Sequence, residues 1–341
     1  MGTPETSLPA AAAPSGWWST LTARAWWPWA KRLVSLGFFA LVAWLVVSQA
    51  RTIAWGGVLT SLRAMPWQVL AGAAVLTFFT YLVYCSFDLV GRHCARHGLS
   101  TPLVLLVACV SYAFNLNLGT LVGGVAFRWR LYDHFGLDTG AITHVTLLAM
   151  VTNWIGYCLL AGVVFLVWPF ELPPRWDLSA AGLRWLGAGL VLAAAGYVLV
   201  CWLRHGRELV LRGRRILPPD WKIALLQEAL SSLHWMLMAG IIWVLLEQRV
   251  DYPAVLATLL VAAVAGVMAH VPAGLGVTEA VFIALLGHRV DKAPLLAALL
   301  AYRAVYYLAP LSIAAVAAAI IEFHRRRDAA EAAAQDPAPQ M

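Results

Sequence analysis

Two charged residues, Arg128 and Glu279, lie inside glycine-rich interruptions between long apolar stretches of the chain. They are 151 positions apart, and the same offset relates Gly123 to Gly274. An ionisable side chain at membrane depth is costly, so it is expected to meet an opposite charge, water or a ligand, and it marks a functional site. Arginine binds phosphate in a planar, bidentate manner, which suits a phospholipid headgroup. The two matched positions therefore predict a working site at the interruptions, with an arginine suited to a phospholipid headgroup.

Two arrangements of these charges are open. Arg128 and Glu279 can pair with each other if the two interruptions meet near the membrane midplane. Alternatively, Arg128 holds an anionic headgroup while Glu279 orients Arg303, which lies within the last apolar stretch and needs a carboxylate or water there. The competing structural interpretation is a buried ion pair that only fixes the packing of the interruptions.

The glycines of both interruptions extend this predicted site. Glycine permits tight turns and close approach of the backbone to a ligand, and helices that begin there direct their N-terminal dipoles at an anion. Close packing of small residues is the simpler alternative. For the asparagines near the first interruption, interhelical hydrogen bonds are favoured over substrate contact. The predicted lipid-binding and transport residues are Arg128, Arg130, Glu279, Arg303, Gly123, Gly124, Gly274, Gly276, Asn115 and Asn153.

No other pattern in the sequence predicts a metal, a cofactor or a catalytic centre. His93, Cys94 and His97 are close in sequence, but zinc takes four ligands and arginines alternate with these three, so a basic loop is expected instead. Asp88 and Glu228 are expected to be solvated or capping residues near helix ends. The sequence contains no Walker A, nucleophile-elbow or dinucleotide-binding motif. The chain is therefore not expected to be an enzyme or an ATP-driven pump.

The elements that must position these residues are membrane helices. The chain has 341 residues, of which 62% are hydrophobic and 12% charged, with a mean hydropathy of +0.76. Soluble domains are about one quarter charged, so this composition indicates an integral membrane protein. The net charge of +7 is attributed to basic cytoplasmic loops, and no nucleic-acid partner is expected.

Apolar stretches recur along the whole chain. Eight can be marked, at about residues 33–50, 67–90, 102–118, 141–168, 183–203, 223–246, 253–270 and 294–321. A helix needs about 20 residues to cross the hydrocarbon layer. The third and seventh stretches are short, and each runs directly into one of the glycine-rich interruptions. Paired short or interrupted segments in the two halves of a chain point to the binding site of a transporter.

The distribution of lysine and arginine decides whether the two short stretches cross. If all eight stretches cross, with the N-terminus inside, 11 basic residues lie inside and 10 outside, against the positive-inside bias. If the third and seventh instead form hairpins that return to the side they entered, the count is 14 inside and 7 outside. We therefore predict an all-α polytopic membrane protein with six full crossings, two re-entrant helical hairpins and both termini cytoplasmic. The hairpins enter from opposite faces, so the two halves have inverted topologies, as in secondary transporters.

This topology sets the predicted boundaries. They are a disordered N-terminal tail with interfacial tryptophans (1–32), a first membrane repeat (33–168) with its hairpin at 102–136, an external loop (169–182), a second membrane repeat (183–322) with its hairpin at 253–287, and a disordered cytoplasmic tail (323–341). Arg51 and Arg63 fall outside in this topology. They are assigned to an interfacial helix at 52–64, where long basic side chains reach the headgroups.

Several motifs resemble one known family. The pattern Pro272-x-Gly274-x-Gly276-x-x-Glu279, followed by an Arg303-bearing final helix, is similar to the flippase-like membrane domain of bacterial lysylphosphatidylglycerol synthases. The stand-alone, YbhN-type inner-membrane branch of that family is more similar still, through Tyr112–Leu116, Val122–Gly124, Arg130–Tyr132, Thr152–Trp154 and His270–Leu286. The resemblance covers nearly all of residues 33–322.

The resemblance implies a protein of the bacterial inner membrane that handles or translocates phospholipids, and in particular anionic ones such as cardiolipin or phosphatidylglycerol. Synthase activity is not expected, because the aminoacyl-transfer domain of the two-domain synthases does not follow the membrane region in this sequence. The alternative function is a non-transporting membrane protein that binds anionic lipid and recruits a lipid-synthesising enzyme through the basic loop 204–222. The expected partners are thus anionic phospholipid, the membrane and, in the alternative, that enzyme.

Overall fold

The computed structural model describes residues 55–168, 180–204, 209–211, 214–216, 218–269 and 274–335. All of the described residues belong to one compact unit, Ala54–Met341. The predicted N-terminal tail and the first predicted apolar stretch, residues 1–50, lie outside the described residues. So do most of the predicted external loop 169–182 and the chain from residue 336 onward.

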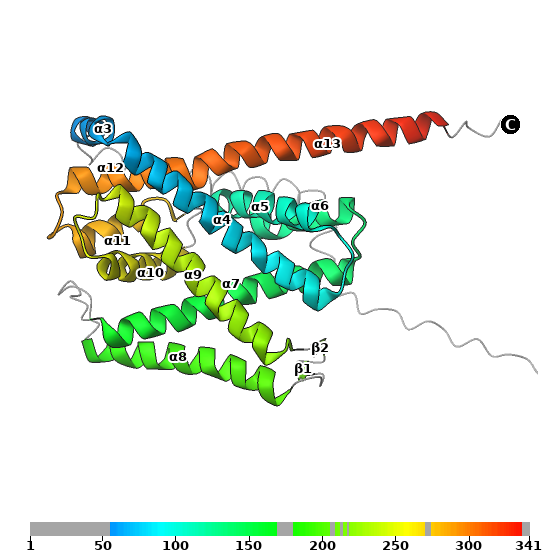
Figure 1. The fold of residues 1–341 in the computed structure, drawn as a ribbon, viewed down its shortest axis with the longest axis horizontal. Helices are drawn as coiled ribbons and strands as arrows, with labels where there is room; N and C mark the ends of the chain where they lie inside the picture. Colours follow the sequence, from blue (N-terminus) through cyan, green and yellow to red (C-terminus); the bar gives the residue numbers. More distant parts are fainter. Residues whose placement is uncertain are drawn as a thin grey trace, which may run out of the picture. The chain divides into compact units, whose positions relative to one another are not determined.

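Helices make up almost all of the described chain (Figure 1). In order they are α3 (Trp55–Ala64), α4 (Trp67–Ala95), α5 (Thr101–Leu118), η1 (Thr120–Ala126), α6 (Phe127–His134), α7 (Thr139–Val167), α8 (Ala180–Leu203), α9 (Trp221–Leu245), α10 (Tyr252–Ala269), α11 (Val277–Leu286), α12 (Lys292–Tyr302), η3 (Arg303–Leu308) and α13 (Ala309–Gln335). The predicted all-α class is confirmed, with one addition inside the predicted basic loop 204–222. There β1 (Leu209–Leu211) and β2 (Arg214–Ile216) form a short antiparallel ribbon.

Seven helices of the described chain are long and apolar enough to cross a membrane. They are Trp67–Ala95, Thr101–Leu118, Thr139–Val167, Ala181–Leu203, Trp221–Leu245, Tyr252–Ala269 and Lys292–His324. These helices coincide with the predicted apolar stretches after the first. The polytopic α-helical class is therefore confirmed by length and composition. The helix predicted near 52–64 is present as α3.

The C-terminal boundary differs from the prediction. Disorder was expected from residue 323, but α13 continues to Gln335. The segment after Arg327 is rich in alanine, the strongest helix former, and this local preference extends the helix past its apolar part.

The first predicted hairpin is formed by α5, η1 and α6. The chain turns at Gly119, whose φ of +82° lies in the left-handed region that glycine tolerates. It then returns along α5 so closely that a Cβ on Gly123 would lie 2.2 Å from the backbone of Phe114. The rings of Phe114 and Phe127 stack at 3.9 Å between centroids. At the open end, His97 before α5 lies against Tyr132 of α6, so the hairpin ends where it begins.

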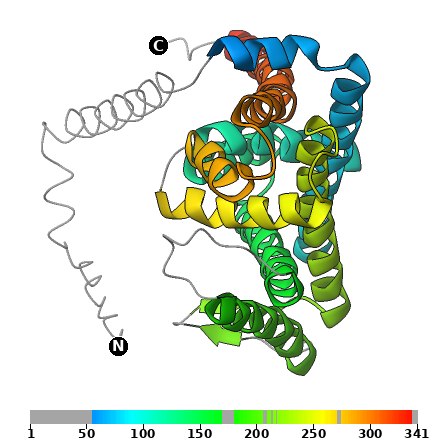
Figure 2. The ribbon, with the colours of Figure 1, turned by 90° about the vertical axis from the view of Figure 1, so that its left-hand side faces the viewer.

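The second predicted hairpin is formed by α10 and α11. Gly274 and Gly276 precede α11 with φ values of +57° and +78°. A Cβ on Gly266 of α10 would lie 3.8 Å from the Cα of Gly274, so the returning chain lies against the first arm. At the open end, Arg289 Nη1 lies 4.0 Å from Asp251 Oδ2, which joins the residue before α10 to the segment after α11. Figure 2 shows α10 (yellow) lying across the view, whereas α7 (green) runs away from the viewer.

The two halves of the unit repeat one order of elements. α5 and α10 both have 18 residues and begin 151 residues apart, at Thr101 and Tyr252. α4 and α9, and α6 and α11, follow the same offset to within three residues. The equivalent helices α4 and α9 pack against each other, so the halves meet through matching elements. The inverted relation of the halves across a membrane stays a prediction.

The core lies where α4, α5, α9 and η3 meet. Tyr84 of α4 stacks on Tyr112 of α5 at 3.5 Å between ring centroids. The Tyr112 hydroxyl lies 2.6 Å from the hydroxyl of Tyr306 and 3.0 Å from Nε2 of His234. These four side chains are buried, and they tie the first hairpin to helices of the second half.

Candidate functional site

Arg128 pairs with Asp88 in the interior of the unit. The Arg128 guanidinium donates from Nε and Nη2 to the two carboxylate oxygens of Asp88, at 3.0 Å each. The Tyr132 hydroxyl donates to the same carboxylate at 2.8 Å, and Arg128 Nη1 donates to the Gly124 carbonyl at 3.3 Å. The side chains of the pair are 2% and 0% exposed. The contacts of Arg128 are thus those of a buried, fully partnered ion pair.

This arrangement corrects two predictions. Arg128 does not pair with Glu279, because Asp88 of α4 takes its place. Asp88 is not a solvated or capping residue, since it is buried and holds both Arg128 and Tyr132. The sequence did contain a signal for this pair, because Asp88 lies within an apolar stretch and a carboxylate there is expected to have a partner inside the protein.

Glu279 and Arg303 form the second ion pair, and here the predicted contact is present. Arg303 binds both carboxylate oxygens of Glu279, with 3.0 Å between Nη2 and Oε2. Arg303 Nη2 also donates to the Gly274 carbonyl at 3.2 Å, and the Gly276 N–H donates to Glu279 Oε2 at 2.9 Å. The two side chains are 13% and 16% exposed, so this pair is reachable from outside. The lipid-binding role of these residues stays a prediction.

The tips of both hairpins contact the π-helix η3. Arg303, the first residue of η3, donates to Glu279 and to the Gly274 carbonyl of the second hairpin. Asn117, near the tip of the first hairpin, donates to the carbonyl of Tyr307 at 3.3 Å. π-Helical turns inside α-helices often occur at functional sites. Large apolar side chains exposed near the tips are Leu118, Leu121, Val267, Met268, Leu275 and Leu308.

Other predicted residues of the first hairpin, and Asn153 of α7, have packing contacts. Gly123 and Gly124 are buried, and a Cβ on Gly124 would lie 3.0 Å from Oδ1 of Asn115. The backbone carbonyl of Asn153 accepts from Ser231 Oγ at 2.8 Å, an interhelical bond between α7 and α9. These contacts agree with the close-packing alternative for the glycines.

Arg130 lies at a separate place. Its side chain is 64% exposed and pairs with Glu322 of α13 at 2.8 Å. It belongs to a cavity of about 730 Å³ between the first hairpin and α13. The cavity is lined by Phe114, Phe127, Arg130, Leu131, Asp133, His134, Ala315, Ala318, Ala319, Ile321 and Glu322. Arg130 and Arg303 are therefore not brought into one cluster.

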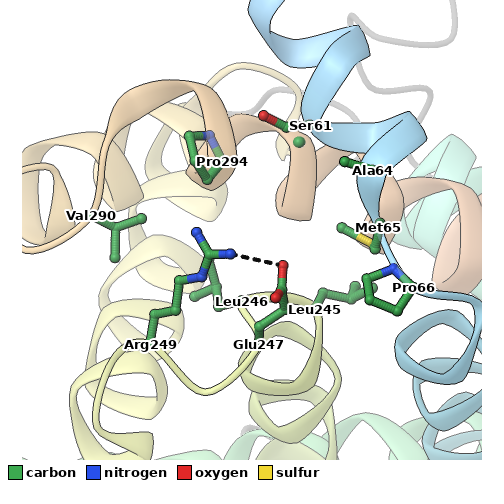
Figure 3. Close-up of a pocket in the computed structure, with 11 residues that line it drawn as sticks. Ser61, Ala64, Met65, Pro66, Leu245, Leu246, Glu247, Arg249, Val290 and Pro294 are labelled. Atoms are coloured by element: carbon green, nitrogen blue, oxygen red, sulfur yellow. Dashed lines mark hydrogen bonds and ion pairs between the residues drawn. The ribbon is translucent and has the colours of Figure 1, made fainter.

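A second cavity, of about 220 Å³, lies among α3, the end of α9 and α12 (Figure 3). Arg249 and Glu247 face each other in it, 3.1 Å apart, with side chains 52% and 39% exposed. None of the predicted lipid-binding residues lines it. Its exposed Glu–Arg pair is a useful reference for the pair of Glu279 and Arg303.

Residues 93–97 do not supply a metal-binding cluster. Within the described ranges, no group of three or more His, Cys, Asp and Glu side chains is arranged to hold a metal ion. Both ring nitrogens of His97 are buried without a hydrogen-bond partner among the described residues. Burial and the nearby Arg92 lower the pKa of His97, which favours its neutral form.

The long apolar helices, the two hairpins and the charged pairs within them define a multi-pass helical membrane protein. The chain belongs to the family of the lysylphosphatidylglycerol synthase transmembrane region, which matches residues 32–314. The sequence is 42% identical over 302 residues to inner membrane protein YbhN of Escherichia coli K12, covering 88% of this chain and 95% of that protein.

Two further relatives extend the comparison. An uncharacterized protein of Synechocystis, slr0712, is 29% identical over 303 residues, or 84% of this chain and 91% of that protein. Phosphatidylglycerol lysyltransferase of Staphylococcus aureus MRSA252 is 22% identical over 247 residues. That match covers 69% of this chain but 27% of the lysyltransferase, so the two proteins share a membrane region only.

Proposed function

We propose that this chain is a phospholipid translocator of the bacterial inner membrane, acting on anionic phospholipids such as phosphatidylglycerol or cardiolipin. The observation that carries the proposal is the Glu279–Arg303 pair, which is partly exposed where two hairpin tips contact one π-helix. Membership of a family named for a lipid synthase supports a lipid substrate. Backbone that is irregular at membrane depth is tolerated where protein or a polar cavity covers it, which supports a working site at the tips.

The contacts of Glu279 suggest how a headgroup binds. Its carboxylate accepts from the Arg303 guanidinium and from the Gly276 N–H at the start of α11. Guanidinium groups and helix N-termini are also the donors that a phosphate takes. We therefore propose that Glu279 occupies Arg303 when no lipid is bound, and that the lipid phosphate displaces it. The acyl chains remain in the bilayer beside the exposed apolar residues of the tips.

The proposed topology has both hairpins re-entrant, from opposite faces, and both termini in the cytoplasm. Each hairpin returns to its own starting point in the molecule, which supports re-entry. The β1–β2 ribbon carries Arg214 and Arg215 in the predicted basic loop, which supports a cytoplasmic position for that end. In this topology the protein alternates access to Arg303 between the two faces.

The test is lipid movement in proteoliposomes with labelled phosphatidylglycerol, cardiolipin and phosphatidylethanolamine. Wild type is expected to move the anionic labels. Arg303→Gln is expected to lose this movement and to bind anionic lipid at least about tenfold more weakly, since hydrogen bonds to charged groups contribute about 1.5–3 kcal/mol. Glu279→Gln is expected to bind anionic lipid more tightly and to release it more slowly. Arg249→Gln, which alters the exposed reference pair, is the control and should behave as wild type.

Two results would contradict the proposal. Movement by Arg303→Gln at the wild-type rate would remove Arg303 from the lipid path. A folded wild type that binds anionic lipid but moves none, with and without a proton gradient, favours the second candidate function. In that function the protein recruits a lipid-synthesising enzyme through the basic loop 204–222. The observation in its favour is the β1–β2 ribbon, whose sequence includes Arg214 and Arg215, and charge-neutralising substitutions there should abolish recruitment.

A further inference from the structure

Glu228 is a buried carboxyl group that the lipid site does not use. It lies on α9, eight residues after the N-cap Asp220, which places it about 12 Å into the helix. The residue is 5% exposed, in contrast to the solvated or capping role that the sequence suggested. It faces the contact between α9 and two other helices, α7 and α8.

The helix that carries Glu228 packs closely against α7. A Cβ on Gly156 of α7 would lie 2.3 Å from Ser231 and 2.9 Å from the carbonyl of Glu228. A Cβ on Gly162 of α7 would lie 2.8 Å from the carbonyl of Gly187 of α8. The backbones of α7 and α9, and of α7 and α8, therefore approach closely, and the backbone of Glu228 takes part in the first of these contacts.

The polar neighbours of Glu228 are bonded to one another. Gln227 Nε2 donates to Thr152 Oγ1, and the Tyr197 hydroxyl donates to Gln227 Oε1, at 2.7 Å each. Ser231 Oγ donates to the carbonyl of Asn153 at 2.8 Å. Glu228 Oε1 is buried and has no hydrogen-bond partner among the described residues. No donor in the described part of this cluster is directed at that oxygen.

The charges around Glu228 also leave it uncompensated. Among the described residues, Cys158 of α7 and Tyr197 and Cys201 of α8 interact electrostatically with Glu228. None of these is a cation, and the ion pairs found in the described part of the chain do not include Glu228. An ionised carboxylate that is buried without a cation or a full set of donors is strongly disfavoured relative to the neutral acid.

We propose that Glu228 binds a proton between α7, α8 and α9, and that this proton is the coupled ion of the translocator. In the conformation described, the carboxyl group is neutral. Separation of the helices admits water on one side, and the proton leaves to that side. In the next cycle the carboxylate takes up a proton from the other side and becomes neutral again. A proton gradient then drives lipid movement. The coupling rests on the proposed lipid function, whereas the proton binding does not.

The first test reads protonation without transport. Infrared spectra of the reconstituted protein are expected to show the carbonyl band of a protonated carboxylic acid at neutral pH. The band should be missing in Glu228→Gln and unchanged in Glu247→Gln, which removes an exposed carboxylate just beyond the same helix. Wild type should also lose thermal stability as the pH rises, because ionisation is opposed in the folded state, whereas Glu228→Gln should not show this loss.

The second test reads coupling. Glu228→Gln mimics the neutral acid in shape, so it should fold and exchange anionic lipid without a gradient. Wild type should move lipid faster under an imposed proton gradient, and Glu228→Gln should show no such stimulation. An absent carbonyl band in wild type overturns the proton site, whatever the transport result. Equal stimulation of wild type and Glu228→Gln overturns the coupling. A band with no lipid movement in any condition overturns the translocator while the proton site stands.

Discussion

The two hairpins hold charged residues at equivalent positions, and each charge is paired, but the pairs are built differently. Arg128 of the first hairpin takes its partner from α4, which precedes the hairpin, and the pair is 2% and 0% exposed. Glu279 of the second hairpin takes its partner from η3, which follows it, and that pair is 13% and 16% exposed. The Arg128–Asp88 pair is thus a fully buried structural contact, and the Glu279–Arg303 pair is an accessible polar contact.

The glycines of the hairpins differ in the same way. Gly123 lies where a side chain would collide with the backbone of α5. Gly276 has open space around its Cβ position, and its φ of +78° is the reason for glycine there. Gly123 therefore serves close packing, whereas Gly276 serves a turn, as Gly119 does at the tip of the first hairpin. Four substitutions test this comparison, in order of decreasing effect on stability.

The largest effect is expected for Arg128→Ala. It leaves the Asp88 carboxylate buried without its cation, and removal of one partner of a buried pair costs about 3–5 kcal/mol. Thermal unfolding in detergent should show a severe loss of folded protein. The double substitution Arg128→Leu with Asp88→Leu should recover much of it, because no charge is left unpaired. Wild-type stability together with lost lipid movement in Arg128→Ala would place Arg128 in the lipid site instead.

The second-largest loss of stability is expected for Gly123→Ala. Its methyl group would lie 2.2 Å from the backbone of Phe114, which must shift, so η1 moves away from α5. Overpacking of this kind costs about 1–3 kcal/mol. The melting temperature should fall clearly below that of Gly98→Ala, a matched substitution with open space outside the hairpin. Equal melting temperatures for these two variants would contradict the close-packing role.

A smaller loss is expected for Gly276→Ala. Its methyl group meets no atom within 4 Å, so only the positive φ opposes it. A left-handed conformation at a non-glycine residue costs about 1–2 kcal/mol per residue. We expect a modest drop in melting temperature with the fold retained. A drop as large as that of Gly123→Ala would mean that both hairpins use glycine for packing.

The smallest effect is expected for Arg130→Gln. Arg130 pairs with Glu322 at the surface, and exposed ion pairs contribute about 0–1 kcal/mol. The melting temperature should stay near that of wild type, and raised salt should remove any difference. A loss comparable to that of Arg128→Ala would show that the cavity beside α13 has a structural role that its exposure does not suggest.

The sequence predicted the elements well because their signals are local. Apolar runs of sufficient length gave the helices α4, α5, α7, α8, α9 and α10, whereas the re-entry of 102–136 and 253–287, which rests on the count of basic residues, stays a prediction. The second ion pair was also within reach, since Arg303 stands alone in an apolar helix and needs a carboxylate. The boundary at residue 323 failed because alanine-rich helix propensity outlasts the apolar stretch.

The partner of Arg128 was missed for a different reason. The matched offset drew attention to Glu279, but Asp88 lies 40 residues before Arg128 on a helix that packs beside the hairpin. The tertiary packing of α4 decides which of the two carboxylates reaches the Arg128 guanidinium. Neither sequence periodicity nor the count of charges predicts that packing. The same holds for Glu228, whose burial follows from the close approach of α7 and α9 at Gly156.

The π-helix η3 joins α12 to α13 without a break, and Arg303 is its first residue. A π-turn holds one residue more than an α-turn, and successive residues of a helix are about 100° apart around its axis. If the wide turn moves along the helix by one step, the residues it passes rotate by about that angle. Arg303 would then rotate about the helix axis and lose its contact with Glu279, while α12 and α13 on either side stay folded.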